Sequence, residues 1–65
     1  MITLTERETD IVKLIAQGKT NPEISRILFI SVHTVKAILE KIYEKTECRN
    51  RVQVAVWTIK NDILN

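Results

Sequence analysis

The sequence of 65 residues contains one cysteine, one histidine, one glycine and one proline. Cys48 has no second cysteine with which to form an internal disulfide, and one cysteine with one histidine is too few for a zinc site. We therefore expect no metal and no cofactor, and a reducing, cytoplasmic location. No stretch resembles a signal peptide or reaches the roughly 18 apolar residues of a membrane span, so we expect no membrane association.

The residue sets that enzymes use are also missing. The sequence contains no glycine-rich phosphate loop, no Cys-His-Asp set at a recognisable spacing, and no acid–base pair with an orienting partner. We therefore expect that the chain is not an enzyme.

The residues that are present are typical of one small globular domain. Apolar residues make up 45% of the chain and charged residues 28%. A domain of this size buries only about 60% of its unfolded surface, so association with a partner would add to its stability. The net charge is +2, and the basic excess lies between Ser31 and Arg51. This mild excess does not by itself indicate a nucleic-acid partner.

The pattern of apolar residues predicts an all-α fold. No run alternates with a period of two residues, as a half-buried strand would. Apolar residues instead recur at helical spacing, and each such segment follows a residue that favours a helix N-terminus. These N-cap residues are Thr5, Thr20, Ser31 and Asn50. We expect one domain over residues 1–65, with four helices over about 5–17, 20–28, 31–45 and 50–62.

Further signals mark the ends of the first two helices. Glu8 and Glu23 each follow a threonine cap by three residues, which is the spacing of a capping box. Gly18 can end the first helix in a left-handed conformation. Pro22 lies in the first turn of the second helix, where its missing N–H costs nothing.

The third predicted helix has one apolar face and one polar face. Its core stripe consists of Val35, Ile38, Leu39 and Ile42. The residues that gather opposite the stripe are His33, Lys36, Ala37, Glu40 and Glu44. A small alanine among long polar residues is typical of a helix that lies close against another molecule.

The link between the second and third helices, Phe29 to Ser31, favours a helix-turn-helix. In that motif the second of the two helices enters the major groove of DNA. Ala37 would let the backbone approach the groove floor and contact a thymine methyl, and Lys36 could reach guanine or a phosphate. Ser31 and Thr34 would offer hydroxyls and N–H groups to phosphates.

Two runs of sequence, LTERETDIVKLIAQGKTNPEISRILFISVHTVK and KTECRNRVQVAV, are similar to a known family. They resemble the C-terminal DNA-binding domain of LuxR/NarL/FixJ-type bacterial transcription regulators. The resemblance covers Leu4 to about Ile59. It implies a four-helix domain that binds double-stranded DNA through its third helix. It also implies a homodimer and an N-terminal receiver or sensor domain in many members.

The resemblance assigns roles to individual residues. Thr20 and Asn21 match phosphate contacts that begin the second helix, and Lys45 matches another. Thr34, Val35 and Lys36 match the Thr-Val-Lys of the third helix, and Ala37 and Glu40 match positions that can contact bases. The DNA-facing set that we predict is Thr20, Asn21, Ser31, His33, Thr34, Val35, Lys36, Ala37, Glu40, Lys41 and Lys45. The fourth helix would carry the dimer contact through Val52, Val56 and Ile59.

Several positions depart from the family pattern. Pro22 and Ile38 stand where Lys and His are frequent, and Thr46-Glu47 replaces a usual Leu-Gly. Glu40 would place a carboxylate among phosphates unless it accepts from cytosine or pairs with Lys36. A second hypothesis therefore stays open, in which the fold serves as a protein interaction or dimerisation module that has weak DNA binding or has lost it.

Purely structural roles are the alternatives for some of these residues. Lys36 could be an ordinary solvated lysine, and Glu40 and Glu44 could form only pairs within the helix. Arg51 is expected to form a salt bridge with Glu8 rather than to contact DNA.

Overall fold

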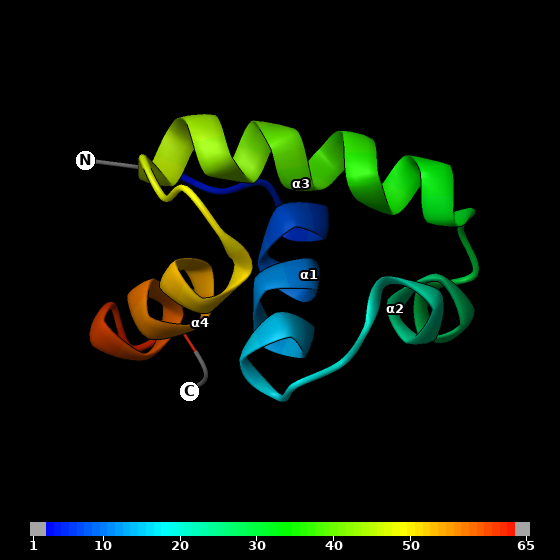
Figure 1. Cartoon of the computed structure of the whole chain (residues 1–65), viewed down its shortest axis with the longest axis horizontal. Coiled ribbons are helices and arrows are strands. Elements are labelled where there is room, and N and C mark those ends of the chain that lie inside the picture. The colour runs from blue at the N-terminus through cyan, green and yellow to red at the C-terminus, as the bar shows by residue number, and fades with distance from the viewer. Residues whose placement is uncertain (1–2, 64–65) are drawn as a thin grey trace.

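The computed structural model describes residues 3–63 and confirms the all-α fold (Figure 1). The helices are α1 (Glu6–Ala16), α2 (Asn21–Leu28), α3 (Val32–Thr46) and α4 (Arg51–Lys60). No strand occurs within residues 3–63. Each helix begins directly after its predicted cap, so all four N-termini are confirmed.

The capping boxes predicted for α1 and α2 are both present. At α1, the Thr5 hydroxyl accepts from the Glu8 N–H at 3.1 Å, and the Glu8 carboxylate accepts from the Thr5 N–H at 2.8 Å. Thr20 and Glu23 make the same pair of bonds at α2. The bonds from Thr20 lower the pKa of Glu23 below its usual value. These boxes satisfy N–H groups that have no partner within the helix.

The end of α1 and the end of α2 both use the left-handed conformation. Gly18, with φ at 84°, follows α1 as predicted. After α2 the same conformation falls on Phe29, with φ at 58° and a side chain that is 93% exposed. The Ile30 N–H then donates to the Ser25 carbonyl at 3.1 Å, which closes the turn between α2 and α3.

The predicted ends of α3 and α4 need correction. We expected Thr46 to lie beyond α3, but Thr46 is its last residue and is buried. Its hydroxyl donates to the Ile42 carbonyl at 2.7 Å, so it carries no unsatisfied polar group into the interior. Helix α4 ends at Lys60, two residues before the predicted Asp62. Asp62 has φ at 58°, which is incompatible with a continuing helix.

The core lies around α1. Its buried apolar residues come from all four helices and are Ile11, Val12, Ile15, Ile24, Val35, Leu39, Ile42 and Val54. Helix α1 packs on α4 and on α3, while α2 packs mainly on α3. Figure 1 shows α3 lying across the molecule with α1 beneath its middle, α2 near one end and α4 near the other. This arrangement leaves the outer side of α3 uncovered by the other helices.

Candidate nucleic-acid interface

The outer face of α3 is open to solvent, as predicted. Val35, Leu39 and Ile42 point into the core on the opposite side. The exposed residues of the outer face are His33, Lys36, Ala37, Glu40, Lys41 and Glu44. At about 100° per residue, Ala37 lies within about 30° of the centre of this arc, between Glu44 and Lys41. The face is therefore low in the middle, with longer side chains on both sides.

The N-terminus of α3 combines two hydroxyls at the start of this face. The Ser31 hydroxyl accepts from the Thr34 N–H at 3.0 Å, and the two hydroxyl oxygens lie 2.9 Å apart. Both residues are exposed. Within residues 3–63, no hydrogen bond inside the chain uses the N–H groups of Val32 and His33. Free N–H groups at the positive end of a helix dipole are typical of an anion-binding position.

The N-terminus of α2 supplies a second group of donors. Thr20 is exposed, and Asn21 is half-buried. The Asn21 side-chain oxygen accepts a hydrogen bond from Arg51 at 2.8 Å. Its NH₂ group therefore points away from Arg51 and keeps its donors.

The predicted role of the Val35 side chain needs correction. We included Val35 in the DNA-facing set because it matches the family's Thr-Val-Lys. The structure shows that Val35 is fully buried. Val35 lies two residues before Ala37, so the two side chains point about 200° apart around the helix axis. The Val35 side chain is a core residue and has no access to a ligand.

Lys45 has a partner within the chain. Its ammonium lies 2.8 Å from the buried carboxylate of Glu8. Burial alone would raise the pKa of Glu8, but the hydrogen bonds from Lys45 and Thr5 outweigh that effect and leave the pKa below its usual value. The charge of Lys45 is therefore engaged in joining α3 to the start of α1.

The predicted salt bridge between Arg51 and Glu8 does not form, so that prediction was wrong. Lys45 already occupies Glu8, and the Arg51 guanidinium instead donates to the Lys19 carbonyl and to Asn21. Sequence reasoning missed this contact because both acceptors, the Lys19 backbone carbonyl and the Asn21 side-chain amide, are uncharged groups about thirty residues away along the chain.

The intrahelical pairs that remained an alternative for Glu40 and Glu44 do not form in the described structure. Of the charged residues on the outer face of α3, none has an ion pair at 4.0 Å or less among the described residues, and the one ion pair that α3 makes there is Lys45–Glu8. Lys36, Glu40, Lys41 and Glu44 thus stand as separate solvated side chains. Lys36 is available to a ligand.

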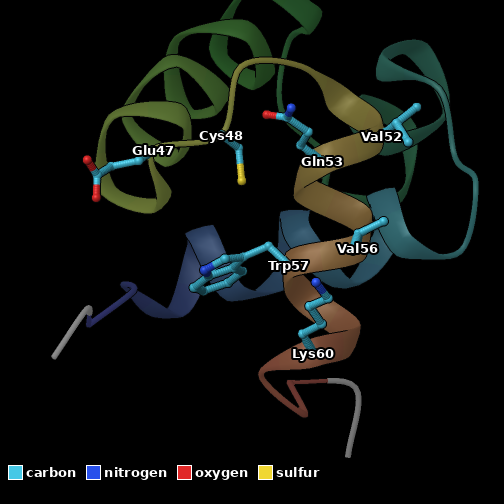
Figure 2. A pocket seen from close by; sticks show the side chains of 7 residues that line it. All are labelled: Glu47, Cys48, Val52, Gln53, Val56, Trp57 and Lys60. Atoms are coloured by element: carbon cyan, nitrogen blue, oxygen red, sulfur yellow. The ribbon is translucent and has the colours of Figure 1, made fainter.

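A surplus of apolar side chains lies on α4. Val52 is 72% exposed, Ile59 is 61% exposed and Val56 is 44% exposed. Val52 and Val56 line a shallow groove together with Trp57 and Cys48 (Figure 2). Such a contiguous apolar patch on a small domain is typical of an interaction surface.

Candidate metal sites and membrane-spanning helices are absent from the part of the chain that the structure describes. Over residues 3–63, no group of three or more His, Cys, Asp or Glu side chains could hold a metal ion. No helix in the same range is long and apolar enough to cross a membrane.

The fold and the exposed third helix define a helix-turn-helix domain, and comparison with known proteins agrees. The family model described as "Bacterial regulatory proteins, luxR family" matches residues 2–58. The chain is 44% identical over 63 residues to the transcriptional regulatory protein LiaR of Bacillus subtilis, which covers 97% of this chain and 30% of LiaR. It is 48% identical over 54 residues to the nitrate/nitrite response regulator protein NarL of Escherichia coli, which covers 83% of this chain and 25% of NarL.

A more distant relative extends the match to the whole chain. The probable transcriptional regulator ycf29 of Porphyra purpurea is 38% identical over 65 residues, which covers 100% of this chain and 31% of the relative. The chain belongs to the luxR family of bacterial regulatory proteins. It spans less than a third of the length of each of these relatives.

Proposed function

We propose that this domain binds double-stranded DNA as the effector part of a transcription regulator, with the outer face of α3 in the major groove. The observation that carries the proposal is the exposed Ala37 near the middle of that face. A helix can approach base edges closely only where its side chains are short. Lys36 beside it is free to reach guanine or a phosphate.

The phosphate contacts would come from two helix N-termini. Ser31 and Thr34 present hydroxyls at the start of α3, and Thr20 and Asn21 lie at the start of α2. Contacts of this kind set the position of a domain on the duplex without reading its sequence. We leave Lys45 out of the contact set because Glu8 already engages its charge.

The acidic residues of α3 shape the expected specificity. Glu40 is exposed one turn after Lys36 and is not paired with it in the described structure. A carboxylate in the groove is favourable where it accepts from the amino group of cytosine and unfavourable elsewhere. We therefore propose that Glu40 favours cytosine at its position in the site.

Salt dependence tests the proposed function against the interaction-module hypothesis. Affinity for a short duplex should fall linearly in log[salt], with a slope of about −0.9 per phosphate, or roughly −4 to −5 for about five phosphates. Titration of a labelled duplex at several salt concentrations measures this slope. Affinity absent at low salt would contradict DNA binding and favour the interaction module.

Lys36→Ala should weaken DNA binding by about 1–3 kcal/mol if Lys36 reads a base, because it removes an exposed cation at the start of the outer face of α3. Circular dichroism should show unchanged helix content, since Lys36 is exposed. The matched control is Arg26→Ala, which removes one positive charge from the exposed far end of α2, outside both the α3 face and the α4 patch. Equal losses of affinity in both variants would show that Lys36 acts only through net charge.

We further propose that two copies of the domain associate through α4 and bind paired half-sites. Val52, Val56 and Ile59 supply the exposed apolar patch that a symmetric contact needs. In a full-length protein, a receiver or sensor domain before this one would control the association. The length of the relatives, of which this chain covers less than a third, supports that part of the proposal.

Val56→Glu should weaken the dimer and, with it, DNA binding to paired half-sites. A carboxylate buried at a two-fold contact would face its own copy, so like charges would repel. Sedimentation at increasing concentration measures the association, and circular dichroism should show nearly unchanged helix content. An unchanged sedimentation profile would contradict the assignment of this surface.

A further inference from the structure

Arg51 joins the start of α4 to the start of α2, two helices that make little other contact with each other. It is the first residue of α4, a helix that packs mainly on α1, whereas α2 packs mainly on α3. The Arg51 guanidinium nevertheless donates to the Lys19 carbonyl and, at 2.8 Å, to the side-chain oxygen of Asn21. These two acceptors lie on either side of Thr20, the N-cap of α2.

The contact fixes which end of the Asn21 amide faces outward. A guanidinium has five donors and no acceptor, so it can bind only the oxygen of the amide. The NH₂ group of Asn21 is thereby directed away from Arg51. Without this contact the Asn21 side-chain amide could rotate and place its oxygen outward, and an amide oxygen repels a phosphate.

The rest of the α2 N-terminus has few donors left. The capping box uses the N–H groups of Thr20 and Glu23, and Pro22 has none. Within residues 3–63, no hydrogen bond inside the chain uses the N–H of Asn21. The donors that α2 can offer to an anion are therefore concentrated on Asn21, together with the Thr20 hydroxyl.

We infer that Arg51 is a positioning residue for the phosphate contact of α2. It holds Lys19 and Asn21 so that the Asn21 amide N–H groups face the duplex, and it never contacts DNA itself. This inference rests on the proposed function. Helix α4 would then have a second role beside the proposed dimer contact. A displacement of its first residue, Arg51, would leave the Asn21 amide free to rotate.

A double-mutant cycle tests the inference with a duplex of roughly 20 base pairs, about two helical turns. Arg51→Ala and Asn21→Ala should each weaken binding about tenfold, and the double variant should also lose only about tenfold, because both changes remove the same contact. Binding is measured where circular dichroism shows every variant fully folded. A purely structural role of Arg51 would instead give losses that multiply in the double variant.

Two further variants separate positioning from charge. Arg51→Lys keeps the charge and the fold, but a single ammonium cannot span both acceptors, so affinity should remain several-fold below that of the unmodified domain. Arg26→Ala removes the same charge from the exposed far end of α2 and should change affinity less than about twofold. Full recovery in Arg51→Lys, or an equal loss in Arg26→Ala, would overturn the inference.

The outcomes for the unmodified domain separate this inference from the proposal on which it rests. If the unmodified domain binds the duplex with a salt-dependent affinity and the losses at Arg51 and Asn21 multiply, the inference alone fails. If the unmodified domain does not bind the duplex at low salt, the proposed function fails and the inference fails with it.

Discussion

Ala37→Tyr should lower the affinity for a DNA duplex by roughly 100-fold, or about 3 kcal/mol. Ala37 is exposed near the middle of the outer face of α3, and Figure 1 shows no neighbouring helix over the outer side of α3. A phenol at this position would hold the helix away from the base edges. The phosphate contacts at the N-termini of α2 and α3 would become longer at the same time. The folded domain should lose little stability, because the new side chain enters solvent and not the core.

Two other substitutions at the same position are the controls for this prediction. Ala37→Ser adds one oxygen and should change affinity by less than about threefold, since the backbone can still approach the groove. Ala37→Gln tests a longer, uncharged side chain and should fall between the serine and tyrosine variants. Equal affinity in all three variants would mean that the centre of this face does not approach the duplex.

Glu8→Ala should lower the free energy of unfolding by about 2–3 kcal/mol, since it removes a helix cap and a hydrogen bond to a charged group. Glu8 is almost completely buried and accepts from both Lys45 and the Thr5 N–H, each at 2.8 Å. A domain of this size has only about 3–10 kcal/mol of stability in total. Urea titration followed by circular dichroism measures the loss, and Glu6→Ala in the same turn should change stability by no more than about 0.5 kcal/mol.

The pH dependence of stability provides an independent test of the same carboxylate. Because the pKa of Glu8 is lower in the folded state, its contribution is present above about pH 4.3, the usual pKa of glutamate, and is lost as the pH falls through the folded value. Glu8→Gln should therefore be less stable than the unmodified domain at pH 7, and the difference should shrink in acid. A difference that stays constant from pH 7 to about pH 3 would contradict a charged Glu8 in the folded state.

The helices could be predicted from sequence because their signals are local. Each cap residue lies next to the segment that it begins, and the apolar stripe of α3 follows from spacing alone. The exposed face containing Lys36 and Ala37 followed from the same spacing. The direction of each side chain around a helix follows from the helical period alone, so the sequence was enough to predict that both residues face outward.

The parts that sequence reasoning missed depend on contacts between distant segments or on unusual backbone conformations. Phe29 and Glu47 adopt left-handed conformations that are usually marked by glycine, so neither residue type signalled its turn. The partners of Lys45 and Arg51 lie more than twenty residues away, and charge alone suggested the wrong pairing with Glu8. Only the packed arrangement decides which cation reaches that carboxylate.

Amide chemical shifts of the ¹⁵N-labelled domain, recorded during titration with a short duplex at low salt, test the central claim most directly. The account predicts that the largest changes fall at the start of α2, at Thr20 and Asn21, and along the start of α3, from His33 to Ala37. Changes confined to α1 and α4, with the amides of Lys36 and Ala37 unmoved at saturation, would contradict it.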